Sequence, residues 1–312
     1  MLLGLSFPVL ACLMMAGLAL DALLGELPVA HPLVGFGRYA AWLEARLNRP
    51  GGIAAGMLAW ALAVLPFGAL AYLVVLQAAT FWSFALHVLL LYFCLGLRSL
   101  QEHCLPIALA LREGDLPNAR RLTARIVSRD TEQASEADLS RAAVESLLEN
   151  GNDAVFGTLF WFLVAGGPGA LLFRLANTLD AVWGYRTPRF LRFGRFAARC
   201  DDVLNWIPAR LTAFSYMALG HTHTAWHCWR TQARHWPSPN AGPVMAAGAG
   251  ALQLALGGMA SYHGVAEMRP PLGEGSPAQA ADIERAWHLV LRAVLLWSLL
   301  VTITAMWETR HA

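Results

Sequence analysis

Long runs of apolar residues recur along the chain and predict its membrane-spanning helices. A helix needs about 20 apolar residues to cross the hydrocarbon core of a bilayer. Such runs extend from Phe7 to Leu24, from about Ile53 to Leu76, from Phe81 to Leu97 and from about Trp287 to Trp307. Only a short polar segment separates the second run from the third, so these two should form an antiparallel hairpin. The pattern predicts an all-α, polytopic integral membrane protein with about four full transmembrane helices.

A further apolar run, residues 155–176, is not expected to cross the membrane completely. Seven arginines lie in the segment 98–150 before it, and five lie in residues 186–199 after it. Arginine-rich segments stay on the cytoplasmic side of a membrane, so both ends of this run belong on the same side, with the N-terminus of the chain outside. Gly166–Gly169 at the midpoint could reverse the chain. We expect a re-entrant or broken helix here, packed against protein or lining a cavity.

Two other segments complete the predicted organisation. Residues 243–258, rich in Gly and Ala, indicate either a half-inserted helix or an ordinary buried helix with small residues at its contacts. Ser276 and Pro277 are typical of a helix start and should introduce the final helix. The chain is therefore divided into three N-terminal transmembrane helices (1–97), a cytoplasm-facing catalytic region with re-entrant helices (98–286) and a C-terminal transmembrane helix (287–312).

Composition supports the membrane assignment and excludes several functions. Of the 312 residues, 57% are hydrophobic and only 14% are charged, whereas soluble domains carry about 25% charged residues. The net charge of +2 gives no reason to expect nucleic acid binding. All 23 basic residues are arginines, which excludes a Walker A phosphate loop and Schiff-base chemistry. Arginine binds phosphate or carboxylate in a bidentate manner, so the expected partners are the lipid bilayer and anionic substrates.

One group of polar residues begins at Ser128-Arg129-Asp130-Thr131 and continues along a predicted helix. On that helix Arg141, Glu145 and Glu149 follow one another at four-residue spacing and share a face. Asn150, Asn152 and Asp153 come next around Gly151, where the helix should stop. Two carboxylates one turn apart with further oxygen ligands suit Mg²⁺. The alternative is a surface ion pair between Arg141 and Glu145.

A second polar group follows the expected reversal. It comprises Asn177 to Asp180, then Arg199-Cys200-Asp201-Asp202, and it lies next to hydrocarbon, where charged side chains are costly unless they face a cavity or a partner. The paired aspartates suit a metal or an amine, while Arg174, Arg186 and Arg199 suit phosphates. The alternative for one of the two aspartates is a helix-start role, which is compatible with the first.

Two weaker motifs lie further along the chain. Pro237-Ser238-Pro239-Asn240-Ala241-Gly242 could form a phosphate-binding nest before a helix, although Pro and Asn are also ordinary turn residues. His221, His223 and His227 are better explained as an interfacial cluster than as a metal site, since no H-E-x-x-H motif accompanies them.

Taken together, short motifs in a fixed order resemble one family over nearly the whole chain. The motifs are Asp21 with Gly25-Glu26 and His31-Pro32, S-R-D-T at 128–131, V-E-S-L-L-E-N at 144–150 with Asp153, N-T-L-D at 177–180 with Gly184-Tyr185, A-R-C-D-D at 198–202, P-A-R-L at 208–211, P-S-P-N-A-G at 237–242, and L-G-G at 256–258 with Tyr262 and Gly264. The chain resembles the CobD/CbiB family, the adenosylcobinamide-phosphate synthases of bacterial cobalamin biosynthesis.

The resemblance implies an ATP- and Mg²⁺-dependent amide ligation. The amine of aminopropanol, or of its phosphate, would join a propionate carboxylate of adenosylcobyric acid, in the cell inner membrane with the active region facing the cytoplasm. A complex with other membrane enzymes of cobalamin assembly is also implied. The expected catalytic residues are Glu145, Glu149, Asp180 and Asp202, and the expected metal ligands are Glu145, Glu149, Asp153, Asp201 and Asp202. The expected substrate- and phosphate-binding residues are Arg129, Asp130, Thr131, Arg174, Asn177, Arg199, Arg210, Ser238 and Asn240.

Two alternatives belong to other functional classes. A signalling or scaffolding membrane protein of the same superfamily would not need the acidic residues. A transporter built from inverted halves is disfavoured because the sequence shows no convincing internal repeat.

Overall fold

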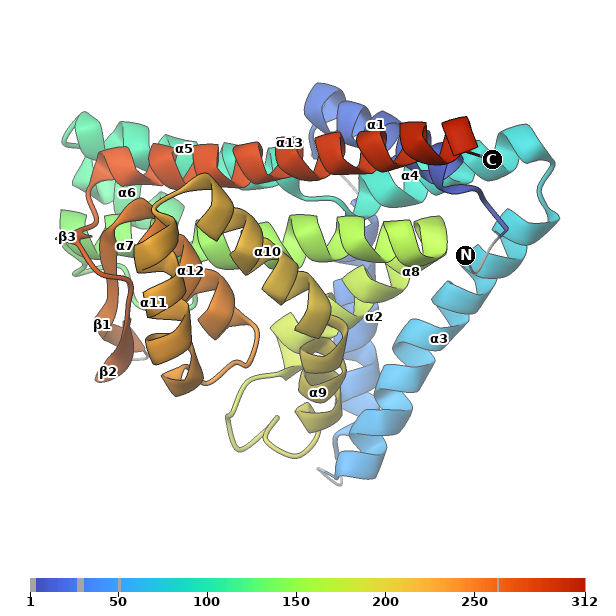
Figure 1. Cartoon of the computed structure of the whole chain (residues 1–312). Helices are drawn as coiled ribbons and strands as arrows, with labels where there is room; N and C mark the ends of the chain where they lie inside the picture. The colour runs from blue at the N-terminus through green and yellow to red at the C-terminus, as the bar shows by residue number, and fades with distance from the viewer. Residues whose placement is uncertain (1–3, 27–30, 50–51, 263, 312) are drawn as a thin grey trace. The chain divides into compact units, whose positions relative to one another are not determined.

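The computed structural model describes residues 4–26, 31–49, 52–262 and 264–311, and these are mostly helical, as predicted (Figure 1). The chain forms two compact units, each assembled from segments distant in sequence. Unit 1 contains Met1–Gly96, Asp153–Asn205 and Leu300–Ala312, and unit 2 contains Leu97–Asn152 and Trp206–Leu299. The three-part division made from the sequence concerns membrane insertion and stays a prediction.

Unit 1 is a set of helices around an apolar core. Aromatic and aliphatic side chains such as Phe36, Leu179 and Phe193 pack there against the small residues Ala59 and Ala63. Small residues let helix backbones approach closely, which is how apolar helices associate in lipid. The helices are α1 (Phe7–Leu24), α2 (Pro32–Leu47), α3 (Ile53–Gln77), α4 (Thr80–Cys94), α8 (Gly157–Trp183), α9 (Arg195–Leu204) and the end of α13 (Ala280–His311).

Helix α8 reverses direction inside unit 1, which confirms the predicted break at the glycines. Ala165 and Gly166 leave helical geometry, and Gly166 takes φ +62°, a conformation that glycine adopts without steric cost. The Gly167 amide donates to Nδ1 of the buried His87, at 2.8 Å. A Cβ on Gly157 would lie 2.2 Å from the Phe173 ring, although 16 residues of straight helix would separate them by about 24 Å. The two parts of α8 therefore lie side by side.

Because Gly157 touches Phe173 across this reversal, Gly157→Ala should destabilise the protein by about 1–3 kcal/mol through overpacking. Gly37 on α2 is the matched control, since a Cβ there meets nothing within 4 Å and Ala is the better helix former. Thermal unfolding in detergent measures both variants. A Gly157→Ala protein as stable as Gly37→Ala would mean that the two parts of α8 are not in contact.

Among the described residues, five helical stretches are long and apolar enough to cross a membrane: Phe7–Leu24, Ile53–Gln77, Thr80–Arg112, Glu136–Trp183 and Ala280–His311. The first two match the predicted spans, whereas the third predicted span ends early, because the α4 helix stops at Cys94 before α5 begins. Helix α3 exposes many large apolar side chains, Leu65, Leu70 and Leu76 among them, as a lipid-facing helix does. The chain is a multi-pass membrane protein.

Unit 2 combines helices with a small sheet. Helix α7 begins with a capping box, in which Ser135 and Asp138 each accept from the other's backbone amide. The elements are α5 (Leu97–Arg112), α6 (Leu116–Thr123), α7 (Glu136–Asn150), α10 (Trp206–Leu219), α11 (Thr222–Gln232), η2 (Ala233–His235), α12 (Ala241–Leu252), β1 (Leu254–Tyr262), β2 (Val265–Leu272), β3 (Ser276–Pro277) and most of α13.

The expected helix stop at Gly151 is wrong. Helix α7 continues through a π-helical turn, η1 (Gly151–Phe156), into α8, and Gly151 keeps right-handed helical geometry with φ −53°. Glycine is required there by packing, since a Cβ would lie 2.4 Å from the Tyr216 hydroxyl. Single π-helical turns within helices are frequent at functional sites.

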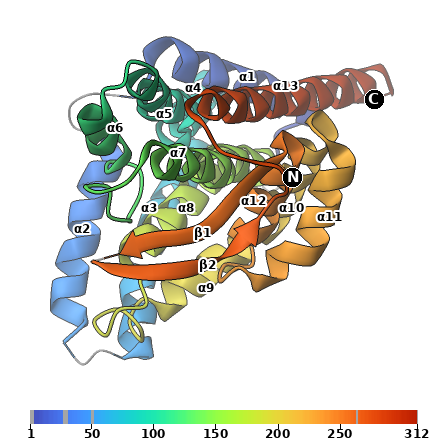
Figure 2. The ribbon, with the colours of Figure 1, turned by 90° about the vertical axis from the view of Figure 1, so that its left-hand side faces the viewer.

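Two further predictions are corrected by the sheet. Residues 243–258 are not one helix, because α12 ends at Leu252 and β1 follows; all of α12 is buried, as in the buried-helix alternative. The last helix begins at Ala280, not at Ser276, because Ser276 pairs with Leu254 in the sheet. Strands β1 and β2 form an antiparallel hairpin (Figure 2) that the all-α prediction did not include.

Candidate functional site

A buried group of carboxylates lies in unit 1, where α9 packs against the second part of α8. Asp201 is 8% exposed. Its Oδ1 accepts from Nδ2 of Asn177 at 3.2 Å and from Nδ2 of Asn205 at 3.1 Å. Asp180, one turn after Asn177 on α8, lies within electrostatic range of Asp201 and Asp202. The structure thus brings N-T-L-D and A-R-C-D-D together.

These aspartates are held close to one another with little solvent. Burial, together with the nearby charge of Asp153, raises the pKa of Asp201 to about 7. Burial also raises the pKa of Asp202, although Arg199 and Arg186 oppose the shift. Like charges in a desolvated site disfavour ionisation, so a cation placed among these groups would be strongly attracted.

Arg174 brings a positive charge close to Asp153 in the same unit. It extends from α8, with electrostatic contacts to Asp153 and Glu26 and a long hydrogen bond of 3.5 Å to Oδ1 of Asn177. Its Nε is buried and has no hydrogen-bond partner among the described residues. Arg199, by contrast, is 71% exposed and lies 3.6 Å from Asp202.

The oxygen donors of these aspartates fit Mg²⁺. This ion binds proteins through one or two carboxylates, and its other ligands are water molecules and substrate phosphates. Within the described ranges, no three His, Cys, Asp or Glu side chains are placed to hold a metal ion by themselves. A complete protein cage is therefore not formed, and the metal roles of Asp153, Asp201 and Asp202 stay predictions.

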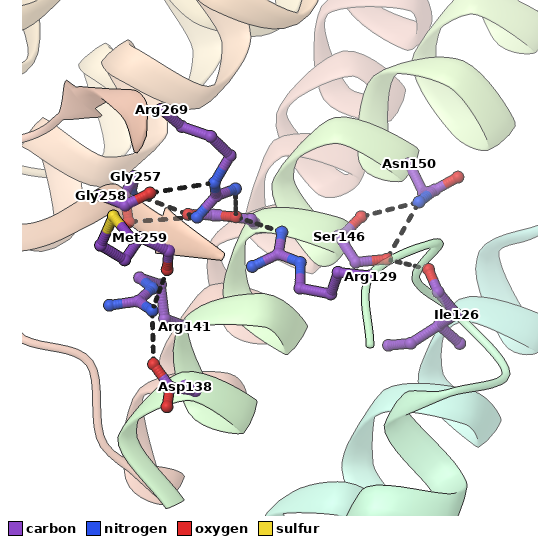
Figure 3. A network of polar contacts seen from close by, with 11 residues as sticks. Ile126, Arg129, Asp138, Arg141, Ser146, Asn150, Gly257, Gly258, Met259 and Arg269 are labelled. Atoms are coloured by element: carbon purple, nitrogen blue, oxygen red, sulfur yellow. Dashed lines mark hydrogen bonds and ion pairs between the residues drawn. The ribbon is translucent and has the colours of Figure 1, made fainter. Parts of the chain in front are cut away.

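In unit 2, Glu145 is enclosed by two arginines, Arg129 and Arg269, which are labelled in Figure 3. Its Oε2 accepts from Arg129 at 2.5 Å and from Arg269 at 2.6 Å, and its Oε1 accepts from the Gly257 amide at 2.8 Å. The side chains of Glu145, Arg269 and Arg129 are 3%, 10% and 13% exposed. Both oxygens are thus occupied by donors, and the catalytic and metal roles expected for Glu145 stay predictions.

The S-R-D-T loop is fastened to the β1–β2 hairpin. Oδ2 of Asp130 accepts from the Ser261 hydroxyl at 2.9 Å and from the Gly264 amide at 2.7 Å, and the Asp130 amide donates to the Ser261 carbonyl at 2.8 Å. Thr131 is buried beside it. Arg141 pairs with Asp138 and donates to the Met259 carbonyl, not to Glu145. The hairpin therefore positions the loop that carries Arg129.

Glu149 lines a small polar pocket of about 200 Å³ in unit 2. Ser128, Asn150, Tyr262 and Arg269 are among the residues that share it. Glu149 thus lies near Arg129 and Arg269, and the catalytic and metal roles expected for it stay predictions.

Arg210 holds the P-S-P-N-A-G turn. It donates to Oδ1 of Asn240 at 2.6 Å and to the Pro239 carbonyl at 2.9 Å. Oγ of Ser238 accepts from the amides of Asn240 and Ala241. These amides already have acceptors, so the turn geometry favours a structural role, and phosphate binding by these residues stays a prediction.

Arg269 is the site residue that sequence reasoning missed. It lies on β2 and reaches Glu145 across 124 positions of sequence. The nearby family motif with Tyr262 and Gly264 indicated that the segment matters, but an arginine beside two prolines gave no local sign of its partner.

Comparisons with known proteins support one family. The family model described as CobD/Cbib protein matches residues 14–290. The chain is 58% identical over 293 residues to the cobalamin biosynthesis protein CobD of Stutzerimonas stutzeri (strain A1501), covering 93% of this chain and 96% of the relative. It is 52% identical to the CobD of Chromobacterium violaceum, covering 91% of this chain and 93% of the relative. It is 39% identical to the CobD of Mycobacterium tuberculosis strain H37Rv, covering 86% of this chain and 88% of the relative. No solved structure matches the chain.

Proposed function

The chain belongs to the CobD/CbiB family of cobalamin biosynthesis proteins, and on this premise we propose that it is an adenosylcobinamide-phosphate synthase. In the proposed reaction, the amine of aminopropanol or of its phosphate condenses with a propionate carboxylate of adenosylcobyric acid. The observation that carries the proposal is the family match over most of the chain.

The chemistry sets what the site must supply. A carboxylate and an amine do not condense unaided in water. In the proposed sequence a carboxylate oxygen attacks the γ-phosphorus of ATP and ADP leaves. The amine nitrogen then attacks the acyl phosphate carbon, inorganic phosphate leaves, and the amine gives up a proton. Such a sequence requires charge stabilisation and positioning of the reactants.

The carboxylates of unit 1 suit the cationic side of this chemistry. Asp201 and Asp202, with Asp153, would hold Mg²⁺, which when bound would supply positive charge to an anionic reactant. Asp180 lies close enough to these aspartates to attract the substrate ammonium. The buried Nε of Arg174 suits an anionic oxygen, because a buried charged donor without an acceptor is costly.

The arginines of unit 2 suit the phosphates. Glu145 holds Arg129 in a fixed position, so that its remaining donors are preorganised. Glu149 and Asn150 border the adjoining pocket and could receive the second charged end of a small substrate.

Localisation and partners complete the proposal. We place the chain in the cell inner membrane with its active region facing the cytoplasm, where the corrinoid and ATP are available. A complex with other cobalamin-assembly enzymes would pass the corrinoid on.

Orientation is tested separately. A topology reporter fused at Arg192 should report a cytoplasmic location, because α8 reverses at Gly166 and both arginine-rich segments belong inside. A fusion at Glu113 provides the reference for the first segment. An external signal at Arg192 with a cytoplasmic signal at Glu113 would contradict the proposed orientation.

Genetics and enzymology test the function itself. The gene should restore growth to a mutant that cannot form cobinamide, while Asp202→Ala should not. The purified protein should form the amide from adenosylcobyric acid, ATP and Mg²⁺ with one of the two amines. Restored growth with both genes would contradict the role of Asp202 in the site. Failure of the wild-type gene to restore growth would favour the scaffolding alternative, for which the acidic residues are dispensable.

A further inference from the structure

A cleft of about 810 Å³ in unit 2 is larger than the Glu149 pocket and is separate in most of its lining. It is bounded by the S-R-D-T loop, the first turns of α7 and the β1–β2 hairpin. Its volume is within the range of about 300–1,000 Å³ that small-molecule sites occupy. The cleft can therefore hold a ligand of nucleotide size.

Two guanidinium groups in the lining have buried nitrogens that lack acceptors. Among the residues described, neither Nη1 of Arg129 nor Nε of Arg141 has a hydrogen-bond partner. Both arginines are fixed by their other nitrogens, Arg129 by Glu145 and Arg141 by Asp138 and the Met259 carbonyl. A buried cationic donor without an acceptor is unfavourable. An anionic oxygen of a ligand would therefore provide the acceptor that each of the two nitrogens lacks.

The remaining lining is largely apolar or already hydrogen-bonded. Of its carboxylates, Asp130 accepts from the hairpin and Asp138 accepts from Ser135 and Arg141, while Glu132 is exposed. Apolar surface comes from residues such as Leu139, Ala142 and Met259. Fixed cations beside an apolar wall suit a ligand with phosphates at one end and a flat base at the other.

We propose that this cleft binds the nucleoside triphosphate that the ligation consumes, with its phosphate chain against Arg129 and Arg141. The inference rests on the proposed function and assigns the nucleotide to one cleft. Arg141 becomes a nucleotide-binding residue, and Glu145 is a positioning residue that holds Arg129. Arg269 in turn fixes Glu145.

Direct binding tests the assignment with the full-length protein in detergent micelles. The dissociation constant of MgATP is measured by titration calorimetry for the wild type, Arg141→Gln and Ala266→Phe. Ala266 lines the cleft on β2 and is exposed, so a phenyl group there would obstruct the cleft without changing charge. We expect MgATP affinity to fall about 10- to 100-fold in Arg141→Gln, as for loss of a charged hydrogen bond. A similar fall is expected in Ala266→Phe, because the ring would occupy space that the ligand needs.

Matched controls separate this effect from general damage. Arg112→Gln removes another paired arginine of unit 2, from an exposed ion pair with Glu284. Val265→Phe adds the same ring at the preceding position, which is outside the cleft lining. Both should bind MgATP as the wild type does. Thermal unfolding checks that each variant is folded, and Arg141→Lys, which keeps the charge, should recover part of the affinity.

The results distinguish this inference from the proposed function. If the two cleft variants weaken MgATP binding but the protein makes no amide, the result supports the assignment of the nucleotide to this cleft and contradicts the proposed function. If the wild type forms the amide but neither variant changes the MgATP affinity, the assignment of the nucleotide to this cleft is overturned. Loss of aminopropanol phosphate or adenosylcobyric acid binding, with MgATP binding intact, would also overturn it by assigning the cleft to another reactant.

Discussion

Asp201→Asn is expected to lower kcat/KM of the amide ligation by about 100-fold or more, the effect of removing one preorganised charged group from an active site. Asparagine has nearly the same volume, and Asn177 and Asn205 would still have an oxygen to donate to. The variant lacks the negative charge that would attract Mg²⁺ and the substrate ammonium. The remaining activity should require more Mg²⁺ than the wild type does.

Stability should change in the opposite direction to activity. Asp201 is buried near Asp153 and Asp202, and these like charges repel one another. Removing one charge should leave the thermal unfolding temperature unchanged or raise it. A loss of activity together with a loss of stability would show that Asp201 acts through the fold.

Asp115→Asn is the matched control for this experiment. Asp115 is exposed and caps α6 by accepting from the Asn118 amide, a role that asparagine fills equally well. Its activity and Mg²⁺ requirement should match the wild type. If Asp201→Asn also matched the wild type, the carboxylates of unit 1 would not be the metal site.

Glu145→Gln is expected to reduce the free energy of unfolding by about 3–5 kcal/mol, the cost of leaving a buried charge without its partner. Arg129 and Arg269 would then face each other with no carboxylate between them. The amide nitrogen of glutamine also adds a donor where the Gly257 amide and both guanidinium groups need an acceptor. Denaturant unfolding in detergent measures the change.

Glu284→Gln provides the comparison within the same unit. Glu284 pairs with Arg112 through two hydrogen bonds, but it is 38% exposed. Water screens such a pair, so its removal should cost at most about 1 kcal/mol. Equal losses in the two variants would mean that burial does not govern the Glu145 cluster.

The sequence determined the features that depend on local pattern. Length and apolarity of the runs at Phe7 and Ile53 predicted two helices whose bounds closely match those of α1 and α3. The glycines at 166–169 predicted the reversal of α8, because glycine allows the backbone conformation that the reversal needs. The ordered motifs predicted the family, which the comparisons confirm.

Which charged side chains pair with one another depends on the folded structure. Four-residue spacing placed Arg141 and Glu145 on one face of a helix, but Glu145 pairs with Arg269 from a distant strand. The local sequence predicts a helix stop at Gly151, yet glycine is needed there because a Cβ would clash with the Tyr216 hydroxyl. Helical periodicity depends on residues that are close in sequence, so it can be predicted from the sequence. The partner of a buried charge comes from a distant chain segment that only folding brings close.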